Sequence, residues 1–348
     1  MAIKSFKDSL FLALQESFFN LAWCLTFYKG FVIVYNMRKI NIALVGCGFL
    51  GQRHLKTLFA LKNKANVVAI CDHHLDHVKA LGRQYHVPVF TDYREISVPL
   101  DAVSVCTPTV THAEIASHFL NKGIHTFVEK PITYSLDEAD ELIRLANEKN
   151  LKLQVGHVER FNSAFTTIEP IAKDPLFIEC HRLNLFPNRS LDIGVVMDVM
   201  IHDIDIVLGL VKSPIKDIQA VGINVLTDKE DIANARLTFA NGCVCNVTAS
   251  RISPEVTRKI RLFTKNAYIS LDYAKQEANM YSKDERGIHK RNIPIEKEEP
   301  LKKELEHFLD CVRDDIKPKV SGVEGREALK VALDITQKIW EHRQSLLQ

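Results

Sequence analysis

The chain has 348 residues, of which 46% are hydrophobic and 25% are charged, and its formal net charge is +2. This length leaves room for two domains with proper hydrophobic cores, and the composition is that of a globular protein. The nearly balanced charge gives no global support for nucleic-acid binding or for attachment to an anionic membrane surface. Eight cysteines occur without a C-x-x-C pair, so we expect free thiols in a reducing compartment, the cytoplasm.

Residues 1–36 differ in texture from the rest of the chain. The segment Phe11 to Tyr28 is rich in Phe, Leu and Trp, but Gln15 and Glu16 make it too polar for a membrane span. It also lacks the small-residue cleavage site of a signal peptide. We expect this segment not to belong to the native protein, with Met37 as the true start. The alternative is an amphipathic helix that docks on a partner or on a membrane surface.

A dinucleotide-binding fingerprint follows. The apolar run Ile40 to Val45 predicts a strand, three glycines in the spacing G-x-G-x-x-G come next, and a helix is predicted after them. The glycines allow a tight turn and a close approach of the pyrophosphate to the helix N-terminus. About 20 residues later a second strand ends at Asp72, whose carboxylate can accept hydrogen bonds from a ribose diol. No Arg directly follows Asp72, so we expect NAD rather than NADP. The expected cofactor contacts here are Gly46, Gly48, Phe49, Leu50, Gly51 and Asp72.

Strands and helices alternate up to about Val158, which predicts a doubly wound parallel sheet. Ligands of such sheets bind beyond the carboxyl ends of the strands. Lys130 lies at such an end, between an apolar strand and a proline that restrains the backbone. Its ammonium could bind a substrate hydroxyl and lower the pKa of that hydroxyl; the alternative is a surface lysine in a turn. The groups that follow predicted strands are Thr107-Pro108, Glu129-Lys130-Pro131 and Gly156-His157.

After Gly156, several β-type runs without intervening helices predict an antiparallel sheet and therefore an α+β domain. The Asn-Gly pair at 241–242 predicts a hairpin within it. We expect an NAD-binding Rossmann domain over residues 37–158 and a substrate-binding and oligomerisation domain over 159–348, whose last helix packs on either domain. The open face of the sheet favours a homo-oligomer, either a dimer or a tetramer. No integral membrane span and no nucleic-acid partner are expected.

A second polar constellation lies in a helix predicted near residues 195–210. Asp198 and His202 are four residues apart, so they share one face of this helix among apolar neighbours. A histidine oriented by a carboxylate is the usual proton acceptor when an alcohol is oxidised. Two alternatives stay open. His202, Asp203 and Asp205 could bind a metal, although they do not share one helix face and no metal is expected, or the polar groups could simply be satisfied within the helix.

The glycine fingerprint, the run Glu129-Lys130-Pro131 and the pair Asp198-x-x-x-His202 together resemble the Gfo/Idh/MocA family of NAD(P)-dependent sugar and inositol oxidoreductases. The resemblance runs from about Met37 to the end of the chain. It implies a Rossmann domain followed by an open-faced antiparallel sheet that binds substrate and often oligomerises. It also implies that Lys130 contacts substrate and cofactor, that His202 is the acid/base and that Asp198 positions the substrate. The residues that it places near the cofactor are Thr107, Pro108, His112 and Glu129.

Three further stretches, 156–162, 197–205 and 231–237, resemble the branch of this family that oxidises nucleotide-linked amino sugars. We therefore expect a UDP-linked sugar whose hydroxyl gives its proton to His202 and whose carbon gives a hydride to nicotinamide, while Lys130 stabilises the alkoxide. Guanidinium groups suit a diphosphate, although an ordinary ion pair is the alternative for each Arg. The expected substrate-binding residues are Lys130, Arg160, Asn162, Arg182, Asp198 and His202. The arginines that would suit the diphosphate are Arg160, Arg182 and Arg251.

Two other functions stay open at this point. The first is an inositol or free-sugar dehydrogenase of the same family. The second belongs to another class, a protein that binds a dinucleotide and acts as a sensor or regulator without turnover. The presence of both Lys130 and His202 disfavours the second alternative.

Overall fold

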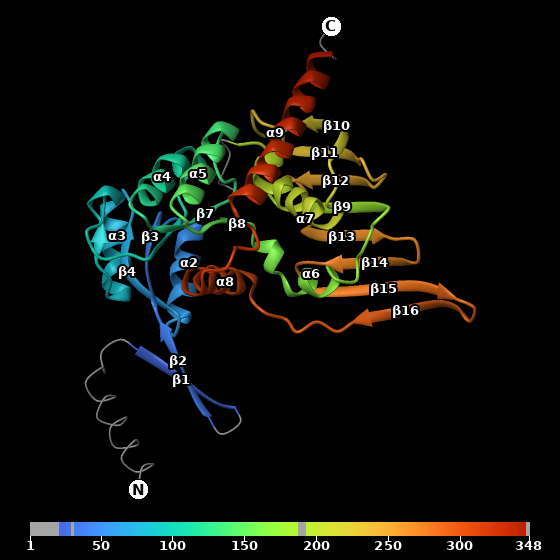
Figure 1. The fold of residues 1–348 in the computed structure, drawn as a ribbon. Helices are drawn as coiled ribbons and strands as arrows, with labels where there is room; N and C mark the ends of the chain where they lie inside the picture. Colours follow the sequence, from blue (N-terminus) through green and yellow to red (C-terminus); the bar gives the residue numbers. More distant parts are fainter. Residues whose placement is uncertain (1–20, 29–30, 187–192, 346–348) are drawn as a thin grey trace.

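The computed structural model describes residues 21–28, 31–186 and 193–345. Its first large unit is a six-stranded sheet in the order β5-β4-β3-β6-β7-β8, with all neighbouring strands parallel. Figure 1 shows β3, β4, β7 and β8 of this sheet to the left of the strands of the second sheet. The strands are β3 (Ile40–Val45), β4 (Ala65–Cys71), β5 (Val89–Phe90), β6 (Ala102–Val105), β7 (His125–Glu129) and β8 (Leu153–Gly156). The strand order reverses between β3 and β6, which is where ligands of doubly wound sheets bind. The predicted Rossmann domain is confirmed.

Helices cover both faces of this sheet because the strands are apolar on both sides. Phe119 and Leu142 pack in the core on one face, whereas Leu55 and Leu58 pack on the other. The helices are α2 (Phe49–Ala60), α3 (Leu75–Tyr85), α4 (His112–Asn121) and α5 (Leu136–Glu148). The predicted cap at Ser135 is present as a capping box with Glu138 at the start of α5.

The second sheet has eight strands in the order β10-β11-β12-β9-β13-β14-β15-β16, and only the pair β12 and β9 is parallel. Buried and exposed residues alternate along β11, so one face packs on helices and the other faces outward. The predicted hairpin turn is confirmed, with Gly242 at a φ of +88°. The strands are β9 (Phe177–Leu183), β10 (Ile215–Ile223), β11 (Ile232–Phe239), β12 (Val244–Ser250), β13 (Thr257–Phe263), β14 (Ala267–Asp272), β15 (Glu277–Asp284) and β16 (Gly287–Ile293).

The C-terminal helices join the two domains. Leu305 and Phe308 of α8 pack in the same core as Phe127 of the first sheet, so this helix returns to the Rossmann domain. Helix α9 contributes Leu329 to the core of the first domain and Ile335 to that of the second. The last helix thus packs on both domains. The helical elements after β8 are η3 (Val158–Phe161), α6 (Ser163–Ile168), the π-helix η4 (Val196–Met200), α7 (Ile201–Val211), α8 (Pro300–Asp314) and α9 (Gly322–Ser345).

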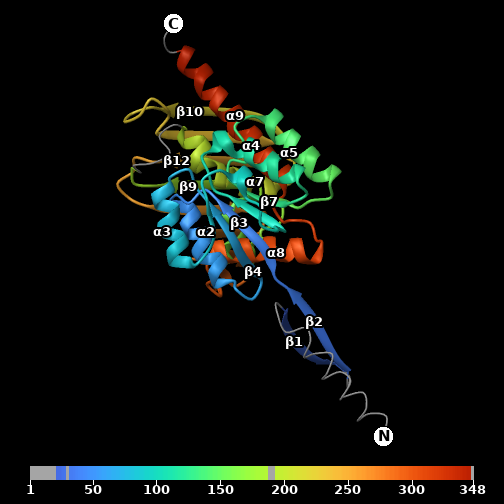
Figure 2. The same cartoon turned by 90° about the vertical axis from the view of Figure 1, so that its left-hand side faces the viewer.

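Before the first domain, β1 (Leu21–Tyr28) and β2 (Phe31–Arg38) form an antiparallel hairpin that extends away from both domains (Figure 2). Residues 21–28 and 31–36 thus lie in strands, so the alternative prediction of an amphipathic helix before Met37 is wrong for these residues. The rest of that predicted helix lies outside the described residues, and a native start at Met37 remains a prediction. In the part of the chain that the structure describes, no helix combines the length and the hydrophobicity needed to cross a membrane.

Candidate active site

The turn between β3 and α2 has no space for side chains at two of its three glycines. Gly46 has a φ of +91°, and a Cβ there would lie 2.5 Å from the carbonyl oxygen of Cys106. A Cβ on Gly51 would lie 1.9 Å from the Gly46 carbonyl oxygen, so α2 packs directly on the turn. A Cβ on Gly48 would meet nothing within 4 Å. This open side of the turn, next to the N-terminus of α2, fits the pyrophosphate of a dinucleotide.

Asp72 follows β4 and holds the glycine turn. Its Oδ2 accepts a hydrogen bond from the Cys47 backbone N–H at 2.7 Å, and its Oδ1 accepts one from the His74 N–H at 2.9 Å. Ligand atoms of Asp72, His73 and His74 lie within 4.8 Å of one another, but the carboxylate already binds two backbone donors. Asp72 therefore lies where a ribose-binding carboxylate is expected, beside the turn and after the second strand.

Glu129 ends β7 and is held by a histidine that the sequence analysis did not single out. His54 Nε2 lies 2.9 Å from Glu129 Oε1, and His54 Nδ1 lies 3.0 Å from the Ser104 hydroxyl. Glu129 Oε2 accepts the Lys130 backbone N–H at 3.2 Å. The carboxylate also lies against Gly156, where a Cβ would be 2.8 Å away. Glu129 thereby connects the glycine-turn helix α2, the Lys130 turn and the end of β8.

His112, at the start of α4, ties together the turns that follow β6 and β7. Its Nδ1 lies 2.8 Å from the Pro131 carbonyl oxygen and its Nε2 lies 2.9 Å from the Thr107 carbonyl oxygen. Burial lowers the pKa of His112, and a neutral ring donates to only one of these carbonyls at a time. Thr107, Pro108 and His112 therefore share the edge of the sheet that carries the glycine turn, and their contact with a cofactor remains a prediction.

Lys130 and Asp198 meet at the interface between the two domains. The Lys130 ammonium donates to the Asp198 backbone carbonyl at 2.6 Å and to its carboxylate Oδ1 at 2.9 Å. Both side chains keep some exposure, 14% for Lys130 and 22% for Asp198. The tertiary structure thus brings together two residues, one after β7 and one in η4, that the sequence could relate only through a family motif.

His202 lies in the first turn of α7, next to the same lysine. Burial, and after it the positive charge of Lys130, lowers the pKa of His202 well below its ordinary value. The ring is therefore neutral near pH 7 and able to accept a proton. Its Nδ1 is buried without a hydrogen-bond partner, and its ring centre lies 6.4 Å from that of His157.

The helix that carries Asp198 and His202 is not a continuous α-helix. Residues 196–200 form a π-helical segment, and the α-helix begins only at Ile201. The helix predicted near 195–210 is present, but its first turn is π-helical. Single π-helical turns often occur at functional sites, and here the wider turn carries the carboxylate that Lys130 contacts.

Two of the arginines expected to bind a diphosphate are inside the second domain. Arg182 donates to both carboxylate oxygens of Asp203, at 2.9 and 2.8 Å, and to Glu159 at 2.8 Å. Arg251 is fully buried and donates to Asp231 at 2.9 Å. Both guanidinium groups thus have carboxylate partners that compensate their burial, which is the ion-pair alternative of the sequence analysis.

Arg160 and Asn162 also face other protein groups. The guanidinium of Arg160 lies against Gly209, where a Cβ would be 1.4 Å from Nη1, and its Nε is 3.7 Å from Asp205. Asn162 caps α6 through the Ala164 N–H and donates to Glu159. Their expected roles in substrate binding remain predictions.

The alternative of a metal site at residues 202–205 does not fit the geometry of the described side chains. Asp203 is bound by the guanidinium of Arg182, and Asp205 faces the guanidinium of Arg160. Burial raises the pKa of Asp205 to about 7, so it is a poor anionic ligand. Two of the three proposed ligands are therefore turned toward cations instead of toward His202.

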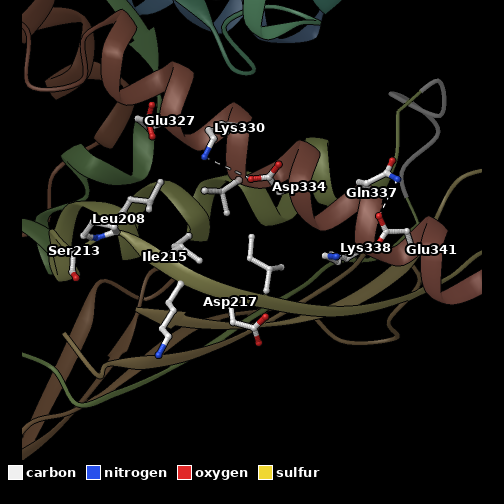
Figure 3. Close-up of a pocket in the computed structure, with 14 residues that line it drawn as sticks. Leu208, Ser213, Ile215, Asp217, Glu327, Lys330, Asp334, Gln337, Lys338 and Glu341 are labelled. Atoms are coloured by element: carbon white, nitrogen blue, oxygen red, sulfur yellow. Dashed lines mark hydrogen bonds and ion pairs between the residues drawn. The ribbon is translucent and has the colours of Figure 1, made fainter. Parts of the chain in front are cut away.

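A pocket of about 530 Å³ lies elsewhere, between the edge strand β10 and helix α9 (Figure 3). Charged side chains of both signs line it, among them Lys216, Asp217, Lys330, Asp334 and Glu341. None of the predicted site residues contributes to it. The groups with catalytic chemistry gather instead between the carboxyl edge of the first sheet and η4 with α7.

The chain matches two family models. Residues 40–157 match the model described as an oxidoreductase family with an NAD-binding Rossmann fold, GFO_IDH_MocA. Residues 154–270 match the GFO/IDH/MocA C-terminal domain. The two matches meet at the end of β8, close to the predicted domain boundary.

Known proteins with the same architecture are similar over most of the chain. UDP-N-acetylglucosamine 3-dehydrogenase of Acidithiobacillus ferrooxidans is 33% identical over 86% of this chain and 97% of its own length. A solved structure of that enzyme superposes with a TM-score of 0.82. The scyllo-inositol 2-dehydrogenase (NAD(+)) of Bacillus subtilis is 26% identical over 86% of this chain and 93% of its own length. The chain therefore belongs to the Gfo/Idh/MocA family and is an NAD(P)-dependent dehydrogenase acting on CH–OH groups.

Proposed function

We propose that this enzyme oxidises a sugar hydroxyl of a UDP-linked amino sugar to a ketone, with UDP-N-acetylglucosamine and its 3-hydroxyl as the first candidate. The observation that carries the proposal is the meeting of the Lys130 ammonium with Asp198 beside the neutral ring of His202. Similarity to the UDP-N-acetylglucosamine 3-dehydrogenase of Acidithiobacillus ferrooxidans supports this choice of substrate. Such a product would serve cell-envelope sugar synthesis, for example of lipopolysaccharide.

The residues divide the chemistry between them. When bound, nicotinamide supplies the acceptor for the hydride that leaves the sugar carbon. His202 accepts the hydroxyl proton, because its pKa is low enough to keep the ring neutral. Lys130 donates a hydrogen bond to the developing alkoxide, and this hydrogen bond becomes stronger as negative charge forms on that oxygen. Asp198 holds the ammonium in place through the two hydrogen bonds described above.

We propose NAD as the preferred cofactor. The support is Asp72, whose carboxylate is fixed by two backbone N–H groups beside the glycine turn. A carboxylate there accepts hydrogen bonds from the ribose diol and repels a 2′-phosphate. Replacing Asp72 by Asn should therefore narrow the difference between the kcat/KM values for NAD and NADP. An unchanged ratio would remove Asp72 from cofactor selection.

For the diphosphate we propose Arg258 as a contact, in addition to the arginines expected from the sequence. Its guanidinium makes only a long hydrogen bond, 3.4 Å to Asn184, while the residue remains exposed. Burial of part of the group, and then the positive charge of Arg182, lowers the pKa of Arg258. Arg53 of α2 adds further positive charge near Arg258. A bound anion would reduce the repulsion between these positive charges.

Activity on a free polyol such as inositol is the second candidate, because two inositol dehydrogenases match most of the chain at 26% and 24% identity. A panel of UDP-sugars, free sugars and inositols, each with NAD and NADP, separates the candidates by NADH or NADPH absorbance. A higher kcat/KM for inositol than for UDP-N-acetylglucosamine would overturn the proposed substrate. We also propose a cytoplasmic homo-oligomer formed through the open face of the second sheet.

A further inference from the structure

His157 is a buried histidine whose ring makes no hydrogen bond with the described residues. It follows β8 directly, its side chain is only about 1% exposed, and neither ring nitrogen has a partner. Burying a polar group in this way is costly unless a partner arrives. The mechanism above gives His157 no task, although its ring lies edge-on to His202.

We propose that His157 is a second proton-carrying residue of the reaction, which receives from His202 the proton of the substrate hydroxyl and passes it toward the buried carboxyl groups of Glu129 and Glu304. The proposal rests on the proposed dehydrogenation of a sugar hydroxyl. It assigns a role to His157 and to Glu304 of α8, which the family motifs leave without one, and a second role to Glu129 of β7.

The first step joins two imidazoles. Their ring centres are 6.4 Å apart, and the ring planes are nearly perpendicular, at 85°. This separation exceeds that of two directly hydrogen-bonded rings, so one water or one substrate hydroxyl would bridge them. The unpaired nitrogens, Nδ1 of His202 and both nitrogens of His157, are the atoms that such a bridge requires.

The second step leads to two carboxyl groups. Glu129 lies against Gly156, the residue next to His157, and is fixed there by His54 and by the Lys130 N–H. Glu304 of α8 is completely buried, and both of its carboxyl oxygens lack a hydrogen-bond partner.

Burial, and then the negative charge of Glu129, raises the pKa of Glu304 well above its ordinary value. Two carboxyl groups so arranged share protons instead of both ionising.

The affinity for a proton rises from the two rings to the Glu304 carboxyl group. Burial, and then the charge of Lys130, lowers the pKa of His157 to about 3, and His202 is lowered well below its ordinary value too. Both rings are therefore neutral near pH 7 and readily release an added proton, whereas Glu304 binds a proton tightly. The charged or titratable groups that act on the two rings are Lys130, Glu129, Arg160, Arg182 and Arg258.

The step conserves protons and electrons. The O–H and C–H bonds of the substrate break and a C=O bond forms, with the hydride going to nicotinamide. The hydroxyl proton goes to His202 and then to one nitrogen of His157. The other nitrogen of His157 releases its proton to the Glu129 carboxylate, so His157 ends neutral, as the other tautomer.

The test compares His157→Ala with His157→Phe in the full-length enzyme. We expect kcat to fall at least tenfold in both variants, while the NAD Kd, measured by fluorescence titration, changes less than threefold. Added imidazole should restore kcat in the Ala variant in a saturable way, because the ring fits the space left behind, and should not restore it in the Phe variant. His118→Gln is the control, since His118 also has a buried, unpaired nitrogen but lies on α4 away from the site.

A solvent isotope effect provides the second readout. In His157→Ala the effect of D2O on kcat should rise, and imidazole should return it to the wild-type value, since proton transfer has become limiting. A wild-type kcat in the Ala variant would overturn the proposal. So would an equal loss in both variants without rescue by imidazole, which would indicate a packing role.

If the wild-type enzyme formed no NADH from any sugar in the panel, the proposed function would fail instead. If the wild type formed NADH but imidazole did not restore kcat in His157→Ala, the proposed function would stand and the proposed proton transfer through His157 would be wrong. Should His157→Ala not fold, Glu304→Gln, which keeps the shape of the side chain, is expected to show the same rise in the solvent isotope effect.

Discussion

The two domains use their polar side chains differently. At the carboxyl edge of the first sheet, Asp72, Glu129 and His112 bind backbone groups of neighbouring turns, and so hold these turns in place. Inside the second domain, Arg182 and Arg251 bind carboxylates and are closed off from solvent. This difference shows that an arginine near a site does not necessarily bind an anionic ligand, because protein carboxylates can already occupy its guanidinium group.

The strongest test of this contrast is at the domain interface. Replacing Lys130 by Met should lower kcat by roughly 10²–10⁴-fold, since an ammonium that stabilises the alkoxide is lost. NAD binding should remain nearly unchanged, as measured by fluorescence titration. Lys122→Met, at the exposed end of α4, is the control and should keep wild-type turnover. Normal turnover in Lys130→Met would remove this lysine from the mechanism.

In the closed region, Arg182→Met should lower the free energy of unfolding by about 3–5 kcal/mol. The reason is that Asp203 and Glu159 would be left buried without their shared cation. Chemical denaturation measures the loss, and Arg144→Met is the control, because the ion pairs of this exposed arginine are screened by solvent and their loss should change the free energy of unfolding far less. A raised KM with unchanged stability would instead make Arg182 a substrate contact.

The pH dependence of stability sharpens the comparison at His157. Its pKa is about 3 in the folded protein, below the ordinary 6.5 of the unfolded chain. Stability from its neutral form is therefore complete above pH 6.5 and is lost as pH falls toward 3, by a few kcal/mol in order of magnitude. Between pH 7 and pH 4.5, the free energy of unfolding should therefore fall less in His157→Asn than in the wild type. Parallel curves for the two proteins would contradict this.

The smallest effect is expected at the start of α5. Ser135→Ala removes the hydroxyl that accepts the Glu138 N–H and should lower the free energy of unfolding by about 1 kcal/mol. The helix end lies outside the site, so kcat should not change. Ser97→Ala, at an exposed position outside the helices, should affect neither quantity. A change in kcat for Ser135→Ala would show that α5 is coupled to catalysis.

Much of the first domain was predictable because its signals are local. The strand, the three glycines and the helix follow one another within 21 residues, Ile40 to Ala60, and the contact that excludes a side chain at Gly51 lies in that same turn. The contact that excludes one at Gly46 is long-range, because it is made with Cys106 after β6. The ends of the parallel strands also place Lys130 at the ligand edge from topology alone. Identifying Lys130 and His202 as partners needed the family resemblance as well.

Other features depend on contacts between distant segments. His54 looks like an ordinary helix residue until Glu129 and Ser104 are seen beside it. The apolar sequence before α7 contains no pattern that distinguishes a π-helical turn from an α-helical one, so this turn depends on packing against the rest of the domain. The arginines are ambiguous by themselves, because a guanidinium has the same preference for a diphosphate as for two protein carboxylates.

The amino-acid sequence by itself thus determined the two domain types, the dinucleotide turn and the residues able to do acid–base chemistry, since periodicity, glycine sterics and side-chain type act over short ranges. Only the tertiary structure decided which of those residues meet. It joined Lys130 to Asp198, placed His157 beside His202 and enclosed Arg182 with Asp203. These pairs are long-range, and their energies depend on burial and distance, which no local pattern specifies.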